Sequence, residues 1–435
     1  TRIGVPAEAA RHSDWDQISE SSTAVRGIGY VTWYPIATEA ASLSDVDSVP
    51  ETIGNWKHRE GSSDFRINLC SVSNTPAAPL MSDLQKAATG SATAVADGEK
   101  CSEHVFSPLG DVVPVFTLAD YRALSRPSAQ IYYLQGHKAS AEDYVLAADL
   151  VTPFITDWFG TPRQTSRLID IIDPEAAPFE SGAVLFAPLR VASDARVAQM
   201  TAAHQLTHAA FFSPRPWINE GLAAFAQPAY REQQSGRAAA LDFMSLYLGQ
   251  LVDTEKRIST EKDAASAESL INTSIPEFQR GKAMYVWWIL RDMVGDTALK
   301  KALAAYRPEQ DKDPAYMQHL IEAQSNRDLE PFFDDWVYRD RGLPDFRVDS
   351  AYVRPTVNGP AVMTVTIENL GGAGAEVPFT VQTETGELVR RIYVSGKSKA
   401  STRVEVPSAP QKIIVNDGSV PETDMGNNSY TIENH

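Results

Sequence analysis

Two histidines spaced four residues apart constrain the fold of this chain more than any other sequence feature. His204 and His208 lie on one stripe of a helical pattern, together with apolar residues at 197, 200 and 211. Four residues make slightly more than one helical turn, so both imidazoles project from the same face of the helix. The pattern therefore predicts a helix that presents two ring nitrogens to one point.

A second helix follows directly. Pro214 and Pro216 break the first helix so that the chain can turn back. The run from Pro216 to Phe225 then predicts a helix that ends at Pro228 and carries Glu220 in its first turn. The carboxylate of Glu220 on this second helix can therefore bind the same metal ion as the two histidines.

Two imidazoles and a carboxylate are the protein ligands of a catalytic zinc site, which leaves a fourth position for water. An arbitrary histidine pair at this spacing is more often buried in a core. The adjacent run overturns that reading here, because it supplies a carboxylate at a compatible position: Trp217-Ile218-Asn219-Glu220-Gly221-Leu222-Ala223.

These segments resemble a known family. His204-Gln205-Leu206-Thr207-His208 and the run that follows it are similar to the HExxH and WxNEGxA elements of gluzincin zinc metallopeptidases, which include the aminopeptidase N family. The segment from Phe278 to Ala283 resembles that family's Tyr-x-Lys-Gly-Ala element. The resemblance extends over roughly residues 20 to 345 and is strongest at the metal motif. It implies Zn²⁺ bound by His204, His208 and Glu220, and a peptide or protein substrate.

Gln205 departs from the family pattern, because it stands where the family has Glu. In the family that carboxylate takes a proton from the zinc-bound water and returns it to the leaving amine, which an amide cannot do. Metal binding should survive, since this residue is not a ligand. Either the chain is a natural zinc-binding pseudoenzyme, or the Glu was replaced in an otherwise working site. We favour replacement, which would make the chain an inactive mutant, because every ligand position is intact.

Phe278 is a second departure, since the resemblance places the family's catalytic Tyr at this position. The hydroxyl of that Tyr stabilises the oxyanion, and losing such a donor costs about 2.7–4 kcal/mol. Tyr285, two helical turns further on the same face, and Tyr230 are the candidate replacements, with His319 as a further one. Each of these residues also has an ordinary structural interpretation.

The third departure concerns substrate binding. Aminopeptidases of this family have a Gly-x-Met-Glu-Asn edge strand whose Glu binds the free amine of the substrate. The corresponding strand here is taken as 179–186, with Leu185 where that Glu would stand. An extended peptide can still pair with the strand near Gly182 and Ala183, and Glu180 is a candidate displaced anchor for an amine. The choice between exopeptidase and endopeptidase therefore stays open.

The periodicity of apolar residues along the sequence predicts an α+β fold in three domains. β-rich runs such as 65–69 predict an N-terminal β domain over 1–115, and mixed strands and helices predict an α+β catalytic domain over 116–345. The resemblance implies that this catalytic domain is thermolysin-like. Short alternating runs such as 361–367 predict a C-terminal Ig-like β-sandwich over 346–435. Within the catalytic domain we expect strands at 130–134 and 167–172, and helices at 140–159, 217–227, 237–251, 276–294, 296–306, 314–324 and 328–338.

Composition limits the partners and the location. A net charge of −17 without a basic run argues against nucleic acid, and no apolar run is long enough to span a membrane. The chain opens at Thr1 without an initiator Met, which favours a trimmed chain that is secreted or periplasmic. Cys70 and Cys101 either form one bridge or stay as two thiols. The sequence does not specify an oligomeric state.

We therefore expect zinc-dependent hydrolysis of peptide bonds, with this chain an inactivated form. The alternative is a natural pseudopeptidase that binds a peptide, a glycan or a surface component. Hydrolysis of a non-peptide bond by the same water chemistry is a third possibility.

Overall fold

The protein is a mixture of helices and sheets. The computed structural model describes residues 17–18, 22–25, 63–71, 80–81, 93–95, 99–106, 115–173, 178–189, 195–261, 269–273, 275, 277–354 and 360–432 of the 435. Its contacts divide the chain into two compact units, 1–214 and 215–435. The three-domain division expected from the sequence is finer than this and stays a prediction.

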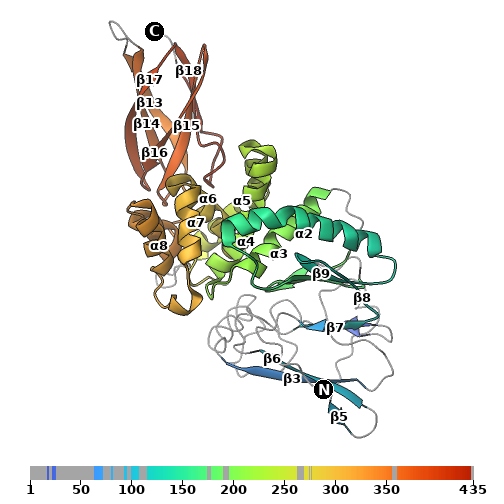
Figure 1. Cartoon of the computed structure of the whole chain (residues 1–435). Coiled ribbons are helices and arrows are strands. Elements are labelled where there is room, and N and C mark those ends of the chain that lie inside the picture. The colour runs from blue at the N-terminus through green and yellow to red at the C-terminus, as the bar shows by residue number, and fades with distance from the viewer. Residues whose placement is uncertain are drawn as a thin grey trace. The chain divides into compact units, whose positions relative to one another are not determined.

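A five-stranded sheet forms the centre of unit 1 (Figure 1). Its order is β11-β12-β10-β9-β8; the three inner strands are parallel, and the outer strands β8 and β11 are antiparallel to their neighbours. Two helices, α2 and α3, pack on each other and against this sheet. The bounds are β8 Arg122–Ser125, β9 Ala129–Tyr133, α2 Lys138–Phe159, β10 Ser166–Asp170, β11 Phe179–Ser181, β12 Val184–Ala187 and α3 Ala195–Ala210. The strands expected at 130–134 and 167–172 and the helix expected at 140–159 are thereby confirmed.

The inner strands are buried because they carry apolar residues on both faces. Ile169, Val184 and Phe186 form one cluster of the core, and the rings of Phe179 and Phe186 stack with centroids 4.6 Å apart across the β11–β12 hairpin. This core fixes the sheet edge from which Glu180 projects.

Two smaller antiparallel sheets come from the first part of the chain. One has the order β1-β2-β7-β4, and the other β3-β6-β5. In the second sheet Cys70 of β3 lies directly opposite Cys101 of β6 in the strand register. Whether the two are bridged stays a prediction. The bounds are β1 Gln17–Ile18, β2 Ser22–Val25, β3 Phe65–Ser71, β4 Leu80–Met81, β5 Thr93–Val95, β6 Glu99–Phe106 and β7 Phe116–Ala119.

Unit 2 begins with helices that pack around buried tryptophans. Trp217 and Trp287 stack with ring centroids 5.3 Å apart, and Trp288 and Trp336 are also fully buried. The expected helices are confirmed in outline, although two of them include a π-helical turn. The bounds are α4 Pro216–Ser235, α5 Arg237–Glu261, π-helix η2 Glu277–Lys282, α6 Ala283–Val294, α7 Asp296–Ala305, 3-10 helix η3 Pro308–Gln310, α8 Tyr316–Ser325, α9 Glu330–Phe333 and π-helix η4 Asp334–Tyr338.

Helix α4 differs from the expected span of 217–227. It continues through Pro228 to Ser235, so the prediction that Pro228 ends it is wrong. The proline removes one hydrogen bond, to the carbonyl of residue 224. Burial of Ala229 and Tyr230 just beyond it holds the last turns in place. Because α4 begins at Pro216, Glu220 is its fifth residue and lies beyond the first turn.

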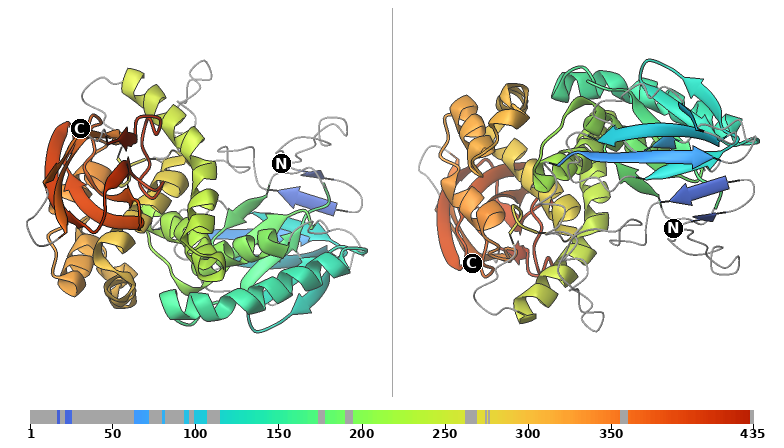
Figure 2. Two further views of the ribbon diagram at one scale, coloured as in Figure 1. Left: turned by 90° about the horizontal axis from the view of Figure 1, so that it is seen from above. Right: turned by 90° about the horizontal axis from the view of Figure 1, so that it is seen from below.

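Two antiparallel sheets make up the last part of unit 2 (Figure 2). Their orders are β13-β14-β17 and β16-β15-β18-β19, and strands of the two sheets contact each other. Burial alternates along β14, which confirms the strand expected at 361–367. That the pair is Ig-like stays a prediction. The bounds are β13 Phe346–Arg354, β14 Ala361–Asn369, β15 Ala375–Thr383, β16 Gly386–Val394, β17 Ser398–Val406, β18 Pro410–Val415 and β19 Ser429–Thr431.

Candidate metal centre

The histidine pair lies on α3 as the sequence predicts. The Nε2 atoms of His204 and His208 are 3.2 Å apart, and the two ring centroids are separated by 4.9 Å. Both side chains are buried. Two nitrogens bound to one tetrahedral zinc at about 2.0–2.1 Å lie about 3.3–3.4 Å apart, so this pair fits a shared metal with almost no movement.

The electrostatic surroundings keep His208 neutral. Burial, and then the neighbouring His204, lowers the pKa of His208 well below its usual range. A neutral imidazole offers a lone pair at one ring nitrogen, which is the form that binds a metal. The burial of His208 therefore favours ligation over protonation at this residue.

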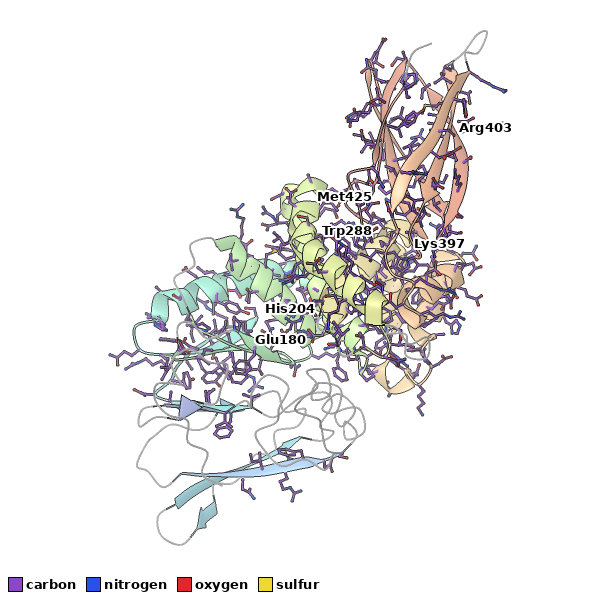
Figure 3. The ribbon with its side chains drawn as sticks, turned by 180° about the vertical axis from the view of Figure 1, so that it is seen from behind. Glu180, His204, Trp288, Lys397, Arg403 and Met425 are labelled. Atoms are coloured by element: carbon purple, nitrogen blue, oxygen red, sulfur yellow. The ribbon has the colours of Figure 1, made fainter. Side chains whose placement is uncertain are left out.

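Glu180 reaches the same point from the sheet (Figure 3). Its Oε2 atom lies 2.9 Å from Nε2 of His204 and 4.0 Å from Nε2 of His208. The three residues each offer one ligand atom, and these atoms lie within 4.8 Å of one another. The sequence placed Glu180 with the substrate, whereas the structure places its carboxylate beside the two imidazoles.

The expected single strand over 179–186 is a hairpin. Gly182, with a φ of 58°, and Ala183 form the turn between β11 and β12. Leu185 lies on the inner strand β12 and pairs with Glu180 across the hairpin, so the outer strand carries Glu180 and not Leu185. A left-handed turn at glycine is a tertiary feature that alternation of apolar residues does not reveal.

Gln205, which follows His204 in the sequence, is buried and contacts the carboxylate of Glu180. It is 1% exposed, and its Nε2 donates a hydrogen bond of 2.5 Å to Oε2 of Glu180. Its Oε1 is buried without a hydrogen-bond partner among the described residues. The amide therefore acts here as a donor, which is a role that a carboxylate at position 205 could not fill.

Glu220 belongs to unit 2, so its role as a ligand stays a prediction. Within that unit its Oε2 accepts a hydrogen bond of 3.3 Å from Nε of Arg280 on η2. Burial lowers the pKa of Arg280. Sequence reasoning missed the contact between Arg280 and Glu220, because the residues are 60 positions apart.

The other candidate residues have packing roles in the structure. Phe278 is fully buried on η2 with Nζ of Lys282 4.7 Å from its ring centroid. The hydroxyl of Tyr285 donates to the carbonyl oxygen of Met244 at 3.0 Å, and that of Tyr230 accepts from Nε2 of Gln234 at 2.6 Å. Burial raises the pKa of both tyrosines. A role for either as an oxyanion donor stays a prediction, as it does for His319, which is exposed on α8.

Comparison with known proteins gives distant structural likenesses. No protein-family model and no curated protein matches the chain. A mutant M1 zinc metallopeptidase from Deinococcus radiodurans, bound to a Tyr-Ser-Ala substrate, is 15% identical with a TM-score of 0.40 over 65% of each chain. Native leukotriene A4 hydrolase from Saccharomyces cerevisiae is 13% identical with a TM-score of 0.46, over 64% of this chain and 47% of that one.

The matched part is less than two thirds of either relative's length. In the described residues no helix is long and apolar enough to cross a membrane.

Proposed function

We propose that this chain is a zinc metallopeptidase of gluzincin type, in a form that binds metal and peptide but turns over little or nothing. The observation that carries the proposal is the pair of buried Nε2 atoms 3.2 Å apart on α3. His204 and His208 would hold Zn²⁺ together with Glu220, which follows them on the next helix of the sequence.

Zinc at this place would supply Lewis acidity toward a peptide carbonyl and a water. The chain's own contribution is the group at position 205, which in an active form must accept a proton and pass it to the leaving amine. The Gln205 amide cannot accept that proton. It donates to Glu180 instead, so position 205 supplies no base for the proton-transfer step.

We place the substrate, an extended peptide or protein segment, along β11 and the turn at Gly182 and Ala183. β11 is the outer strand in the described part of the sheet, and outer strands bind peptides by strand addition. Glu180 also lies on that strand. Release of single amino-terminal residues would mark an aminopeptidase, and internal cleavage an endopeptidase.

A natural pseudopeptidase that binds a peptide, a glycan or a surface component is the second candidate. The contact between Gln205 and Glu180 favours this candidate, because the amide at position 205 donates a hydrogen bond to the carboxylate of Glu180. A Glu at position 205 would face the Glu180 carboxylate at hydrogen-bond distance, and two carboxylates at such a distance repel each other.

The variant Gln205→Glu, loaded with zinc, separates the two candidates. General-base catalysis contributes about 10²–10⁴-fold in rate, so the variant should cleave peptides at least about 100-fold faster than the unchanged chain. Cleavage is measured by mass spectrometry on a broad peptide and protein library. The double variant Gln205→Glu/His204→Gln should be inactive and is the control. If Gln205→Glu cleaves nothing while the unchanged chain binds a peptide or glycan, the pseudopeptidase reading replaces the peptidase.

A further inference from the structure

We propose that Glu180 is itself a ligand of the metal, and that Gln205 is the positioning residue that holds its carboxylate there. The inference rests on the proposed zinc site at His204 and His208. It assigns to this chain a protein ligand in addition to the two histidines and Glu220.

The three candidate ligand atoms surround a point at bonding distance. The two Nε2 atoms and Oε2 of Glu180 form a triangle with sides of 2.9, 3.2 and 4.0 Å, and the circle through its corners has a radius of about 2.0 Å, which is the length of a zinc–nitrogen or zinc–oxygen bond. One ion can therefore reach all three atoms at once. The longest side joins Glu180 to His208, and a shift of less than about 1 Å would bring it to the tetrahedral separation.

The orientation of Gln205 is set by Glu180. The amide has one donor end and one acceptor end, and turning it over would bring its oxygen against the carboxylate. In the observed orientation Nε2 donates to Glu180, although Oε1 is left buried without a partner among the described residues. A group that fixes a ligating carboxylate in this way commonly controls metal affinity.

A role for Glu180 as an anchor for a substrate amine fits these contacts less well. Its side chain is 13% exposed, and Oε2 is directed at His204 and Gln205. An incoming amine would have to displace both contacts. Bonding to the metal retains the contact with Gln205, while the metal takes the place between Oε2 and the two imidazoles.

One residue then controls whether a position of the metal is taken. Bound Glu180 would occupy one of the four positions of a tetrahedral zinc, which water could otherwise fill. The substitution Gln205→Glu would put a carboxylate against Glu180 and drive it from the metal. The same change that supplies a base would therefore also open the site.

The test measures zinc affinity by competition with a chromophoric chelator, on the full chain. The variant Glu180→Gln keeps the shape of the side chain and removes its charge, and it should weaken zinc binding at least about tenfold. The variant Gln205→Met, which removes the donor, should weaken it about 10–100-fold. The matched control is Glu142→Gln on α2, a carboxylate of the same unit whose side chain is 51% exposed, and its affinity should be unchanged.

A second measurement reads the open position directly. In the Co²⁺-substituted chain, azide should bind more weakly, by its charge-transfer absorption, than in the Glu180→Ala variant, where the position of the carboxylate is vacated. Equal azide affinity for the two would overturn the inference. Circular dichroism of each variant without metal confirms that the helices are retained.

The outcomes separate this inference from the proposed function. If His204→Gln abolishes zinc binding but Glu180→Gln binds zinc as the unchanged chain does, the metal site stands and the role of Glu180 is wrong. If His204→Gln binds zinc as before, the metal site itself is wrong and the inference falls with it.

Discussion

At the scale of single residues, Gly221 shows how packing positions the helix that carries Glu220. A Cβ at Gly221 would lie 2.7 Å from Cβ of Ala283 and 2.9 Å from Nε1 of Trp287. Both neighbours are fully buried, so neither can easily move away. The missing side chain therefore lets α4 approach α6 closely, and this approach fixes where Glu220 lies within unit 2.

The substitution Gly221→Ala should lower the free energy of unfolding by about 1–3 kcal/mol, because the added methyl overpacks the contact between the helices. This loss should exceed the gain in helix propensity of about 1 kcal/mol. The control is Gly249→Ala on α5, where nothing lies within 4 Å of the new Cβ. That variant should be more stable by up to about 1 kcal/mol. Urea unfolding followed by tryptophan fluorescence measures both, and a Gly221→Ala variant as stable as the unchanged chain would refute the packing argument.

At the scale of elements, the connection between β18 and β19 is organised around one buried carboxylate. Oε1 of Glu422 accepts hydrogen bonds from the amides of Asn416 and Asn428, and its Oε2 accepts one from the backbone N–H of Phe346. Burial raises the pKa of Glu422 to about 7 although these hydrogen bonds oppose the shift. The connection is thereby joined to the first residue of β13.

Unfolding should be pH-dependent through Glu422. The folded chain binds this proton more tightly than the unfolded chain, in which the pKa is 4.5. The contribution of the group to stability is therefore full below pH 4.5 and is lost as the pH rises to about 7. The loss is on the order of 3 kcal/mol.

The variant Glu422→Gln should lack this part of the slope of unfolding free energy against pH. The variant Glu387→Gln, which changes an exposed position on β16, should keep it. Equal slopes for the unchanged chain and Glu422→Gln between pH 4.5 and 7 would contradict the assignment. Urea titrations at a series of pH values give the slopes.

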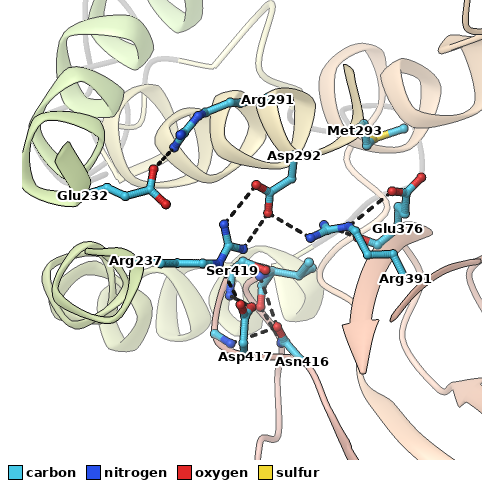
Figure 4. Close-up of polar contacts among 12 residues, drawn as sticks. Glu232, Arg237, Arg291, Asp292, Met293, Glu376, Arg391, Asn416, Asp417 and Ser419 are labelled. Carbon is cyan, nitrogen blue, oxygen red and sulfur yellow. Dashed lines mark hydrogen bonds and ion pairs between the residues drawn. The ribbon is translucent and has the colours of Figure 1, made fainter. Parts of the chain in front are cut away.

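At the scale of the whole molecule, charged residues connect the helices of unit 2 to its C-terminal sheets (Figure 4). Asp292, near the end of α6, accepts two hydrogen bonds from Arg237 of α5 and one from Arg391 of β16. Arg391 also pairs with Glu376 of β15, and Arg237 with Asp417 after β18. The side chain of Asp292 is 11% exposed, so these charges are only partly screened by solvent.

Export of the chain stays a prediction from the sequence.

Removal of the Asp292 charge should loosen this connection. The variant Asp292→Asn should lower the unfolding free energy of unit 2 by about 1.5–3 kcal/mol, because hydrogen bonds between charged groups are lost in a partly buried place. The variant Asp242→Asn changes an exposed carboxylate of α5 and should stay within about 0.5 kcal/mol of the unchanged chain. Thermal unfolding followed by circular dichroism measures the difference, and equal midpoints for the two variants would contradict a structural role for the network.

The sequence by itself determined the features that depend on neighbours along the chain. The facing of His204 and His208, the spans of α2 and α7, and the alternation in β14 all follow from periods of 3.6 or 2 residues. Only the tertiary structure decided the rest. Helix α4 continues through Pro228 because the residues beyond it are packed in the core. The register of the β11–β12 hairpin places Glu180 in contact with Gln205, 25 positions away. Contacts of that kind depend on how elements pack and pair, and no period within either segment encodes the place where they meet.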